Sequence, residues 1–227
     1  MNILNSKKKR FENYNIIICI GNKTKLGSLL IKSLIKKVNK KKLNNFICEY
    51  YDSKEFLSKE DSFFKENISE KKLIVIFCAT GGVRTEKHNS SRVKSSLEYD
   101  LTLLRQLVNY SKDIHILYIS SVLGLINSKK NSDYSICKRE AELEFNKLFQ
   151  DLENIRKLSI IYPGRLKNNW FNFFLSGSIT YKRLVKIIIK IISKGFHFNY
   201  YLIGLDAFIF LLINRPRILK DLSLRIM

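Results

Sequence analysis

The sequence has few prolines, few glycines and few acidic residues. It holds 2 prolines and 9 glycines in 227 residues, which excludes collagen-like and proline-rich architectures. Its hydrophobic content of 45% excludes a disordered chain. Only 20 acidic residues stand against 41 basic ones, and the formal net charge is +21. Such an excess first suggests a polyanionic partner: nucleic acid, an acidic membrane surface or a phosphorylated ligand.

Cysteine and histidine are also scarce, and their spacing indicates neither disulfides nor a metal site. Cys19, Cys48, Cys78 and Cys137 form no CxxC pair, and three of them fall inside apolar runs. We interpret them as thiols of a reducing compartment, which predicts a cytoplasmic protein. The three histidines are isolated from one another, so no metal is expected.

Long hydrophobic runs are absent as well. The first apolar run, Ile16–Ile20, is too short for the core of a signal peptide. The longest candidate for a membrane span, residues 196–214, is interrupted by Asp206. We therefore predict no transmembrane helix.

Short apolar runs alternate with segments of helical periodicity up to Gly164. This alternation predicts an α/β fold with a doubly wound parallel sheet and helices on both faces. About 20 residues separate Asp52 from the third run, so any strand near residues 55–57 must be short. The expected strands are 16–20, 46–51, 73–78, 115–119 and 158–162, and the expected helices are 26–38, 95–110 and 134–152.

The chain after Gly164 has a different pattern. We expect a basic amphipathic helix at 176–192, a late strand at 199–204 and a helix at 207–219. Residues 165–227 would form a small substrate lobe that completes the same domain as residues 1–164. It would pack at the carboxyl edge of the sheet, where open α/β sheets bind ligands.

A glycine pair lies between the first strand and the first helix. In the sequence GNKTKLG, Gly21 would let the chain leave the strand, and Gly27 would let a pyrophosphate approach the helix start. The alternative is an ordinary strand-to-helix turn, and the pair alone does not decide between them.

A second set of candidate functional residues combines serine, tyrosine and lysine. Tyr134 and Lys138 lie at i and i+4 on one helix face, and Ser121 ends a strand 13 residues before the tyrosine. An ammonium near a phenol favours its ionised form, so Tyr134 could exchange a proton with a carbonyl or alcohol. Ser121 would donate a hydrogen bond to the same oxygen. A second such pair, Tyr50 and Lys54, lacks the serine, and each residue alone has a purely structural alternative.

Together these features resemble the short-chain dehydrogenase/reductase family. The matching pieces run in the family's order over residues 16–164: Gly21 to Gly27, Cys78-Ala-Thr-Gly-Gly82, Ile119-Ser-Ser121, Tyr134 to Lys138, and Tyr162-Pro-Gly164. The resemblance implies a Rossmann fold, NAD or NADP as cofactor, and hydride transfer to or from a carbonyl or alcohol substrate.

The resemblance also implies residue roles. Ser121 would position the substrate oxygen, Tyr134 would be the acid/base, and Lys138 would bind ribose and tune the tyrosine. Pro163 and Gly164 would lie near the nicotinamide. The implied cofactor-binding set is Gly21, Lys23, Lys25, Leu26, Gly27, Asp52, Ala79, Gly81, Tyr134, Lys138, Pro163 and Gly164.

The sequence departs from the family at two positions. Lys25 replaces the middle glycine of the phosphate turn, where it would either crowd the pyrophosphate or pair with it. Asp100 replaces the usual asparagine, which acts in a proton relay largely through its backbone carbonyl, so the aspartate remains in the catalytic set. Cofactor choice is open, because Asp52 favours NAD and Lys23 favours NADP.

Three functions compete. The first is an oxidoreductase for a small or nucleotide-linked carbonyl compound such as a sugar precursor. The second is a dinucleotide-binding sensor or scaffold without turnover, suggested by Lys25 and Asp100. The third is an RNA-binding Rossmann protein, for which Tyr50 and Tyr51 beside the lysine run are the single aromatic hint.

The charge is unevenly distributed. Residues 1–60 carry a net charge of +9, residues 61–164 of +3 and residues 165–227 of +9. This distribution fits an anionic cofactor or an anionic substrate at least as well as it fits nucleic acid. We therefore do not expect nucleic acid as a partner. The Ile-rich face of 182–194 suggests peripheral contact with an acidic membrane. The family resemblance suggests a homodimer or homotetramer.

Overall fold

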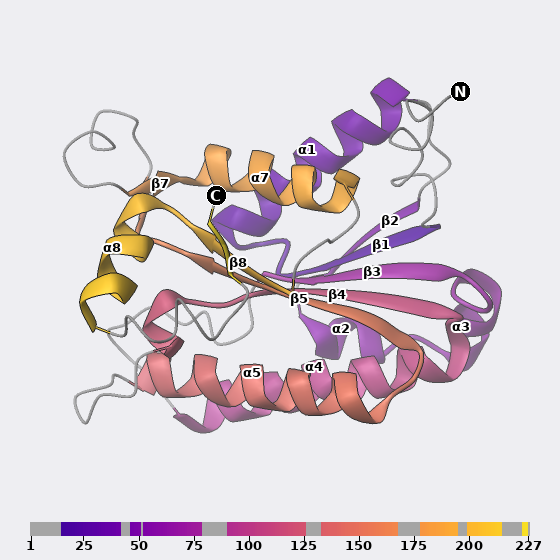
Figure 1. Ribbon diagram of the computed structural model, residues 1–227. Helices are drawn as coiled ribbons and strands as arrows, with labels where there is room; N and C mark the ends of the chain where they lie inside the picture. The colour runs from indigo at the N-terminus through magenta and orange to yellow at the C-terminus, as the bar shows by residue number, and fades with distance from the viewer. Residues whose placement is uncertain are drawn as a thin grey trace, which may run out of the picture.

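The computed structural model describes the segments of the chain that build the sheet and its covering helices. They are residues 15–41, 46–50, 52–78, 90–125, 133–167, 178–194, 199–214 and 224–226. Figure 1 shows these elements as a central twisted sheet between two layers of helices.

The strands are short runs rich in β-branched and aromatic residues. Within the described residues they form a seven-stranded sheet of order β2-β1-β3-β4-β5-β8-β9. All neighbouring pairs are parallel. Because helices cover both faces, an inner strand such as β1 is buried at every position. The strands are β1 (Ile16–Ile20), β2 (Phe46–Tyr50), β3 (Lys72–Phe77), β4 (Asp113–Ile119), β5 (Ile155–Pro163), β8 (Tyr200–Ile203) and β9 (Leu224–Ile226).

Two helical layers divide the core into two clusters. Helices α1 and α7 lie on one face of the sheet, and α4 and α5 lie on the other (Figure 1). Successive strand residues alternate between the layers, so Ile17 packs with α1 and α7 while Ile18 packs with α4 and α5. This arrangement confirms the predicted doubly wound α/β fold. The helices are α1 (Lys25–Lys41), α4 (Ser90–Tyr110), α5 (Asp133–Asp151) and α7 (Tyr181–Lys194).

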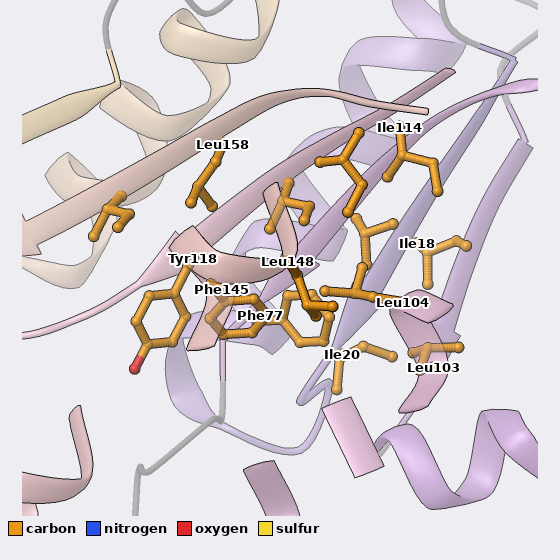
Figure 2. Packing of buried hydrophobic residues seen from close by; sticks show 14 of the residues in the cluster. Ile18, Ile20, Phe77, Leu103, Leu104, Ile114, Tyr118, Phe145, Leu148 and Leu158 are labelled. Carbon is orange, nitrogen blue, oxygen red and sulfur yellow. The ribbon is translucent and has the colours of Figure 1, made fainter. Parts of the chain in front are cut away.

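An aromatic cluster fixes α5 against the sheet. The ring centroid of Phe145 on α5 lies 5.1 Å from that of Phe77 on β3 and 4.9 Å from that of Tyr118 on β4 (Figure 2). All three side chains are fully buried. Aromatic contacts of this kind add to the free energy gained by burial. The rings thereby set the position of the rest of α5 relative to the ends of β3 and β4.

Residues 55–57, for which the sequence allowed at most a short strand, are helical. The segment forms helix α2 (Ser53–Leu57), followed by α3 (Asp61–Asn67). Asp52 caps α2, because its carboxylate accepts a hydrogen bond from the Glu55 N–H at 2.9 Å. Phe56 is buried against Tyr50, with ring centroids 4.4 Å apart. Since Tyr50 packs in the core, it cannot be the base-stacking residue that the RNA hypothesis needed, and Tyr51 lies outside the described residues.

The residues after Gly164 extend the sheet. Strand β8 pairs with β5, and β9 pairs with β8. The expected late strand and helices are present as β8, α7 and α8 (Leu205–Asn214), whereas β9 is not expected from the sequence. Two short strands, β6 (Leu166–Lys167) and β7 (Ile179–Thr180), pair separately. The domain boundary at residue 164 stays a prediction.

The apolar face of α7 belongs to the core. The exposed residues of this helix include the basic side chains of Lys182, Arg183, Lys186 and Lys190. The membrane hypothesis is therefore wrong for this helix, because the Ile-rich face that it required already packs against α1 and the sheet. The buried set is Leu184, Val185, Ile188, Ile191 and Ile192.

Within the described segments, no helix is both long and apolar enough to cross a bilayer. The same segments contain no group of three or more His, Cys, Asp or Glu side chains that could hold a metal ion. Cys19, Cys78 and Cys137 carry thiols outside any disulfide, and the first and last of them are buried. The Cys48 side chain lies outside the described residues.

Candidate active site

The turn between β1 and α1 depends on both of its glycines. Gly21 has a φ of 93°, in the left-handed region that favours glycine. A Cβ on Gly27 would lie only 2.1 Å from the Gly21 carbonyl oxygen. The turn also joins β2, since the N–H groups of Gly21 and Asn22 donate to the Tyr50 carbonyl at 2.9 and 3.1 Å. The predicted glycine pair thus lets two stretches of backbone pack directly against each other.

Thr24 caps the start of α1. Its hydroxyl donates to the Gly21 carbonyl at 2.7 Å and accepts from the Gly27 N–H at 3.0 Å. Leu26 is buried beneath the turn. The first N–H groups of a helix have no intrahelical acceptor, and this end of a helix favours phosphate. Beside it, the side-chain Oδ1 of Asn22 is a buried acceptor with no hydrogen-bond partner in the described structure.

Two lysines flank this turn in different ways. Lys23 and Lys25 are both exposed. The Lys25 ammonium lies 5.3 Å from the centre of the Tyr181 ring at the start of α7. Such a cation–π contact links the first turn of α1 to α7. Lys25, which replaces the middle glycine of the family's phosphate turn, therefore contacts the neighbouring helix.

Asp52 has a structural task of its own. It follows β2, where the sequence places it, but one carboxylate oxygen caps α2 through Glu55. A ribose hydroxyl would have to share the carboxylate with this cap. The contribution of Asp52 to cofactor choice stays a prediction.

The structure brings the predicted lysine to the end of β4. Lys138 is 3% exposed, and its ammonium donates to the Ile119 carbonyl at 2.9 Å. It also lies 5.0 Å from the centre of the Tyr118 ring. Ser121 follows two residues after Ile119, before the 3₁₀ turn η1 (Val122–Leu125). The backbone of Tyr134 lies in the first turn of α5, one turn before Lys138, and its side chain lies outside the described residues.

Burial and nearby acids act in opposite directions on Lys138. Burial lowers the pKa of its ammonium to about 8, while the negative charges of Glu142 and Asp100 raise it. The ammonium is therefore still the main form at neutral pH. A positive charge held one helical turn from Tyr134 is the feature that the acid/base hypothesis requires.

Asp100 is buried on the inner side of α4. Its carboxylate accepts a hydrogen bond from the Ser53 hydroxyl at the start of α2. The side chain that replaces the family's asparagine therefore joins α2 to α4 and adds negative charge near Lys138. The relay through its backbone carbonyl stays a prediction.

Glu142 is a buried acid that the sequence analysis missed. Its carboxylate accepts hydrogen bonds from the Ser120 hydroxyl and from the Tyr162 hydroxyl, the latter at 2.9 Å. Burial raises its pKa to about 7, although both hydrogen bonds and the Lys138 charge lower it. The available signal was its spacing, since it lies four residues after Lys138 on the same helix face.

The end of β5 holds the predicted Pro-Gly pair. Pro163 ends the strand, and the Gly164 N–H donates to the Ile203 carbonyl of β8 at 2.8 Å. A Cβ on Gly164 would lie 2.0 Å from an oxygen of Asp206. The Asp206 carboxylate accepts from the Arg165 N–H at 2.6 Å, so it closes this edge of the sheet. In the sequence, Asp206 stands out only as an interruption of an apolar run.

Ala79 and Gly81, which the resemblance places in the cofactor-binding set, lie outside the described residues. Among the other predicted residues, Lys138 of α5 contacts the end of β4, and the charge of Asp100 on α4 acts on it. Ser121 follows β4 and Pro163 ends β5, so both lie at the carboxyl ends of neighbouring parallel strands, the edge at which open α/β sheets bind ligands.

No protein-family model and no curated protein sequence matches the chain. Solved structures do match. A small-chain dehydrogenase in complex with NADPH has a TM-score of 0.59 at 14% identity, covering 86% of this chain and 97% of its own. A MalC reductase/Diels-Alderase from Malbranchea aurantiaca has a TM-score of 0.60 at 11% identity, covering 86% and 96%. An NADPH-dependent 3-quinuclidinone reductase from Rhodotorula rubra has a TM-score of 0.60 at 12% identity, covering 89% and 94%.

The sheet order, the crossover helices and these similarities define a Rossmann-type α/β protein. More narrowly, the chain has the fold of the short-chain dehydrogenase/reductases. At these identities the similarity establishes the fold alone, and the function depends on the residues of the site itself.

Proposed function

We propose that this protein is an NAD(P)-dependent oxidoreductase that transfers hydride to or from a carbonyl or alcohol substrate. One observation carries the proposal: the buried Lys138 ammonium donates to the Ile119 carbonyl at 2.9 Å. This contact joins the helix of Tyr134 to the strand that leads into Ser121. Two of the similar proteins are described as NADPH-bound or NADPH-dependent, which supports the same cofactor class here.

The residues present fit a dinucleotide. The glycine turn and the start of α1 would receive the phosphates, with Gly21, Leu26 and Gly27 as the backbone elements and Lys23 as a nearby charge. The buried Asn22 Oδ1 offers an acceptor for a ligand hydroxyl. Further along the sheet edge, the remaining groups proposed to hold the cofactor are Lys25, Asp52, Ala79, Gly81, Lys138, Pro163 and Gly164.

The cofactor, when bound, would supply or accept the hydride. The chain's own residues would manage the proton. In reduction, the Tyr134 hydroxyl would donate its proton to the substrate oxygen as the carbonyl becomes an alcohol, and in oxidation it would take that proton back. Ser121 would donate a hydrogen bond to the same oxygen. The Lys138 ammonium would stabilise the phenolate between these steps.

The substrate and the assembly are extensions of this proposal. The net charge of +9 on residues 165–227 favours an anionic small molecule. A sugar or nucleotide-sugar precursor is the proposed substrate class. A homodimer or homotetramer in the cytoplasm stays a prediction.

Binding is tested by thermal-shift titration with NAD, NADP and their reduced forms. A specific dinucleotide at a hundred times its Kd should add about 2.7 kcal/mol to the unfolding free energy. The absence of a shift with all four would contradict the proposal.

Catalysis is tested with Tyr134→Phe. This variant should lose about 10²- to 10⁴-fold in kcat because the proton donor is gone, while its Kd for the dinucleotide is unchanged. Tyr99→Phe on exposed α4 surface is the matched control and should behave as wild type. Equal turnover by the Tyr134 variant and wild type would exclude the acid/base role.

A dinucleotide sensor without turnover is the second candidate. The observation in its favour is that the side chain at each departure from the family pattern contacts the protein: Lys25 contacts Tyr181, and Asp100 contacts Ser53. A thermal shift with NADPH combined with no turnover on any carbonyl substrate would support it.

A further inference from the structure

Three elements meet at the carboxylate of Glu142. The residue lies on α5, its Oε1 accepts from Ser120 just after β4, and its Oε2 accepts from Tyr162 near the end of β5. The partners are 22 residues before and 20 residues after it. Glu142 and Tyr162 are 8% and 1% exposed, so the hydrogen bonds form away from water. One carboxylate thus joins both strand ends to the helix of Tyr134 and Lys138.

The position of the two strand ends matters for the proposed site. Ser120 immediately precedes Ser121, and Tyr162 immediately precedes Pro163. A shift of either strand end would move a residue proposed to touch substrate or cofactor. Such displacements of about 1 Å are costly in catalysis.

Charges surround Glu142 from several elements. The charges of Lys138 and Arg139 on its own helix lower the pKa of Glu142. The charge of Glu142 in turn raises the pKa values of Tyr162 on β5 and Tyr200 on β8. Asp100 of α4 and the two cysteines Cys78 and Cys137 also raise the pKa of Lys138. Within this group the Lys138 ammonium has Glu142 as its strongest favourable charge partner.

We propose that Glu142 is a positioning residue of the active site: its ionised carboxylate fixes the ends of β4 and β5 and holds Lys138 in its charged form. The proposal rests on the proposed oxidoreductase function. It also makes that function dependent on pH in the neutral range, because the pKa of Glu142 is about 7.

The two protonation states differ in their hydrogen bonds. The carboxylate accepts from both hydroxyls, whereas the protonated acid has a donor of its own and so displaces one of these two bonds. Protonation also removes the negative charge that favours the Lys138 ammonium, so the pKa of Lys138 falls. Lys138 stays protonated at these lower pH values, so the loss of one of the two hydrogen bonds to the strand ends should make activity decline as the pH falls through about 7.

The test compares Glu142→Gln with Glu144→Gln, whose side chain is partly exposed on another face of the same helix. In the protein without ligand, the ε-carbon resonance of Lys138, assigned with Lys138→Arg, reports its titration. Glu142→Gln should lower the pKa of Lys138 by about one unit. Its kcat should fall on the order of tenfold and lose the acid limb near neutral pH, with little change in KM. Glu144→Gln should change neither.

An unchanged Lys138 titration in folded Glu142→Gln would overturn the proposal. If that variant does not fold, Tyr162→Phe replaces it: removal of one donor should raise the pKa of Glu142 and move the acid limb of kcat to higher pH. If the acid limb of kcat in Tyr162→Phe lies at the same pH as in wild type, the proposal is also overturned. Wild-type protein that binds no dinucleotide contradicts the oxidoreductase function instead, and the ligand-free titration distinguishes the two failures.

Discussion

The two halves of the candidate site consist of different chemical groups. The turn between β1 and α1 is made of backbone: the Gly21 carbonyl, the Thr24 cap and a Gly27 that leaves no room for a Cβ. The cluster between β4, β5 and α5 is made of buried ionisable side chains, chiefly Lys138 and Glu142. The backbone turn has no room for added atoms at Gly27, whereas the side-chain cluster contains titratable groups and so responds to pH.

The largest expected effect comes from adding one methyl group to the backbone site. Gly27→Ala places a Cβ 2.1 Å from the Gly21 carbonyl oxygen, so the start of α1 must move. We expect a loss of about 4 kcal/mol in unfolding free energy, measured by urea denaturation. Dinucleotide affinity should fall with it.

Gly164→Ala is the matched control for this change. Its Cβ would also clash, at 2.0 Å, but with the side chain of Asp206 and not with backbone. A side chain can rotate away, so the cost should be smaller and should disappear largely in an Asp206→Ala background. A Gly27→Ala variant as stable as Gly164→Ala would contradict the view of a rigid backbone turn.

The second effect concerns the pH dependence of stability. Burial raises the folded-state pKa of Glu142 from 4.5 to about 7, so the folded state holds a proton that the unfolded state has lost. Stability from this group should fall as the pH rises through that interval, by about 3 kcal/mol. Burial lowers the pKa of Lys138 from 10.5 to about 8, so its contribution to stability should rise between these values.

These two groups together predict a stability minimum between about pH 7 and 8. Denaturant unfolding across the pH range measures it. In Glu142→Gln the fall between pH 4.5 and 7 should vanish, while Glu144→Gln should keep it. Parallel curves for wild type and Glu142→Gln would show that the carboxyl is not desolvated.

The smallest effect belongs to Lys25. Its ammonium lies over Tyr181 at an exposed position, so the contact should contribute about 0.5 kcal/mol. A double-mutant cycle of Lys25→Ala and Tyr181→Leu measures the coupling. A coupling above about 2 kcal/mol would mean that the side chain has a larger role in joining α1 to α7.

The elements of the fold could be predicted where the information is local. Runs such as Ile16–Ile20 and Leu73–Cys78 specify buried strands, because a sheet covered on both faces requires apolar residues at every position. Residues 55–57, where the sequence allowed a short strand, are helical because the Asp52 cap and the burial of Phe56 favour a helix. The amphipathic pattern of α7 was correct, but the pattern alone does not say whether its apolar face meets a sheet or a membrane.

Sequence by itself determined the alternation of strands and helices, the glycine turn, and the order in which Ser121, Tyr134 and Lys138 follow one another. These features depend on propensity, periodicity and spacing within about a dozen residues. Only the tertiary structure decided that Glu142 meets Ser120 and Tyr162, and that Asp206 lies against Gly164. Those contacts join residues 20 or more apart, and the register of the strands and the packing of α5 and α8 against them bring those residues together.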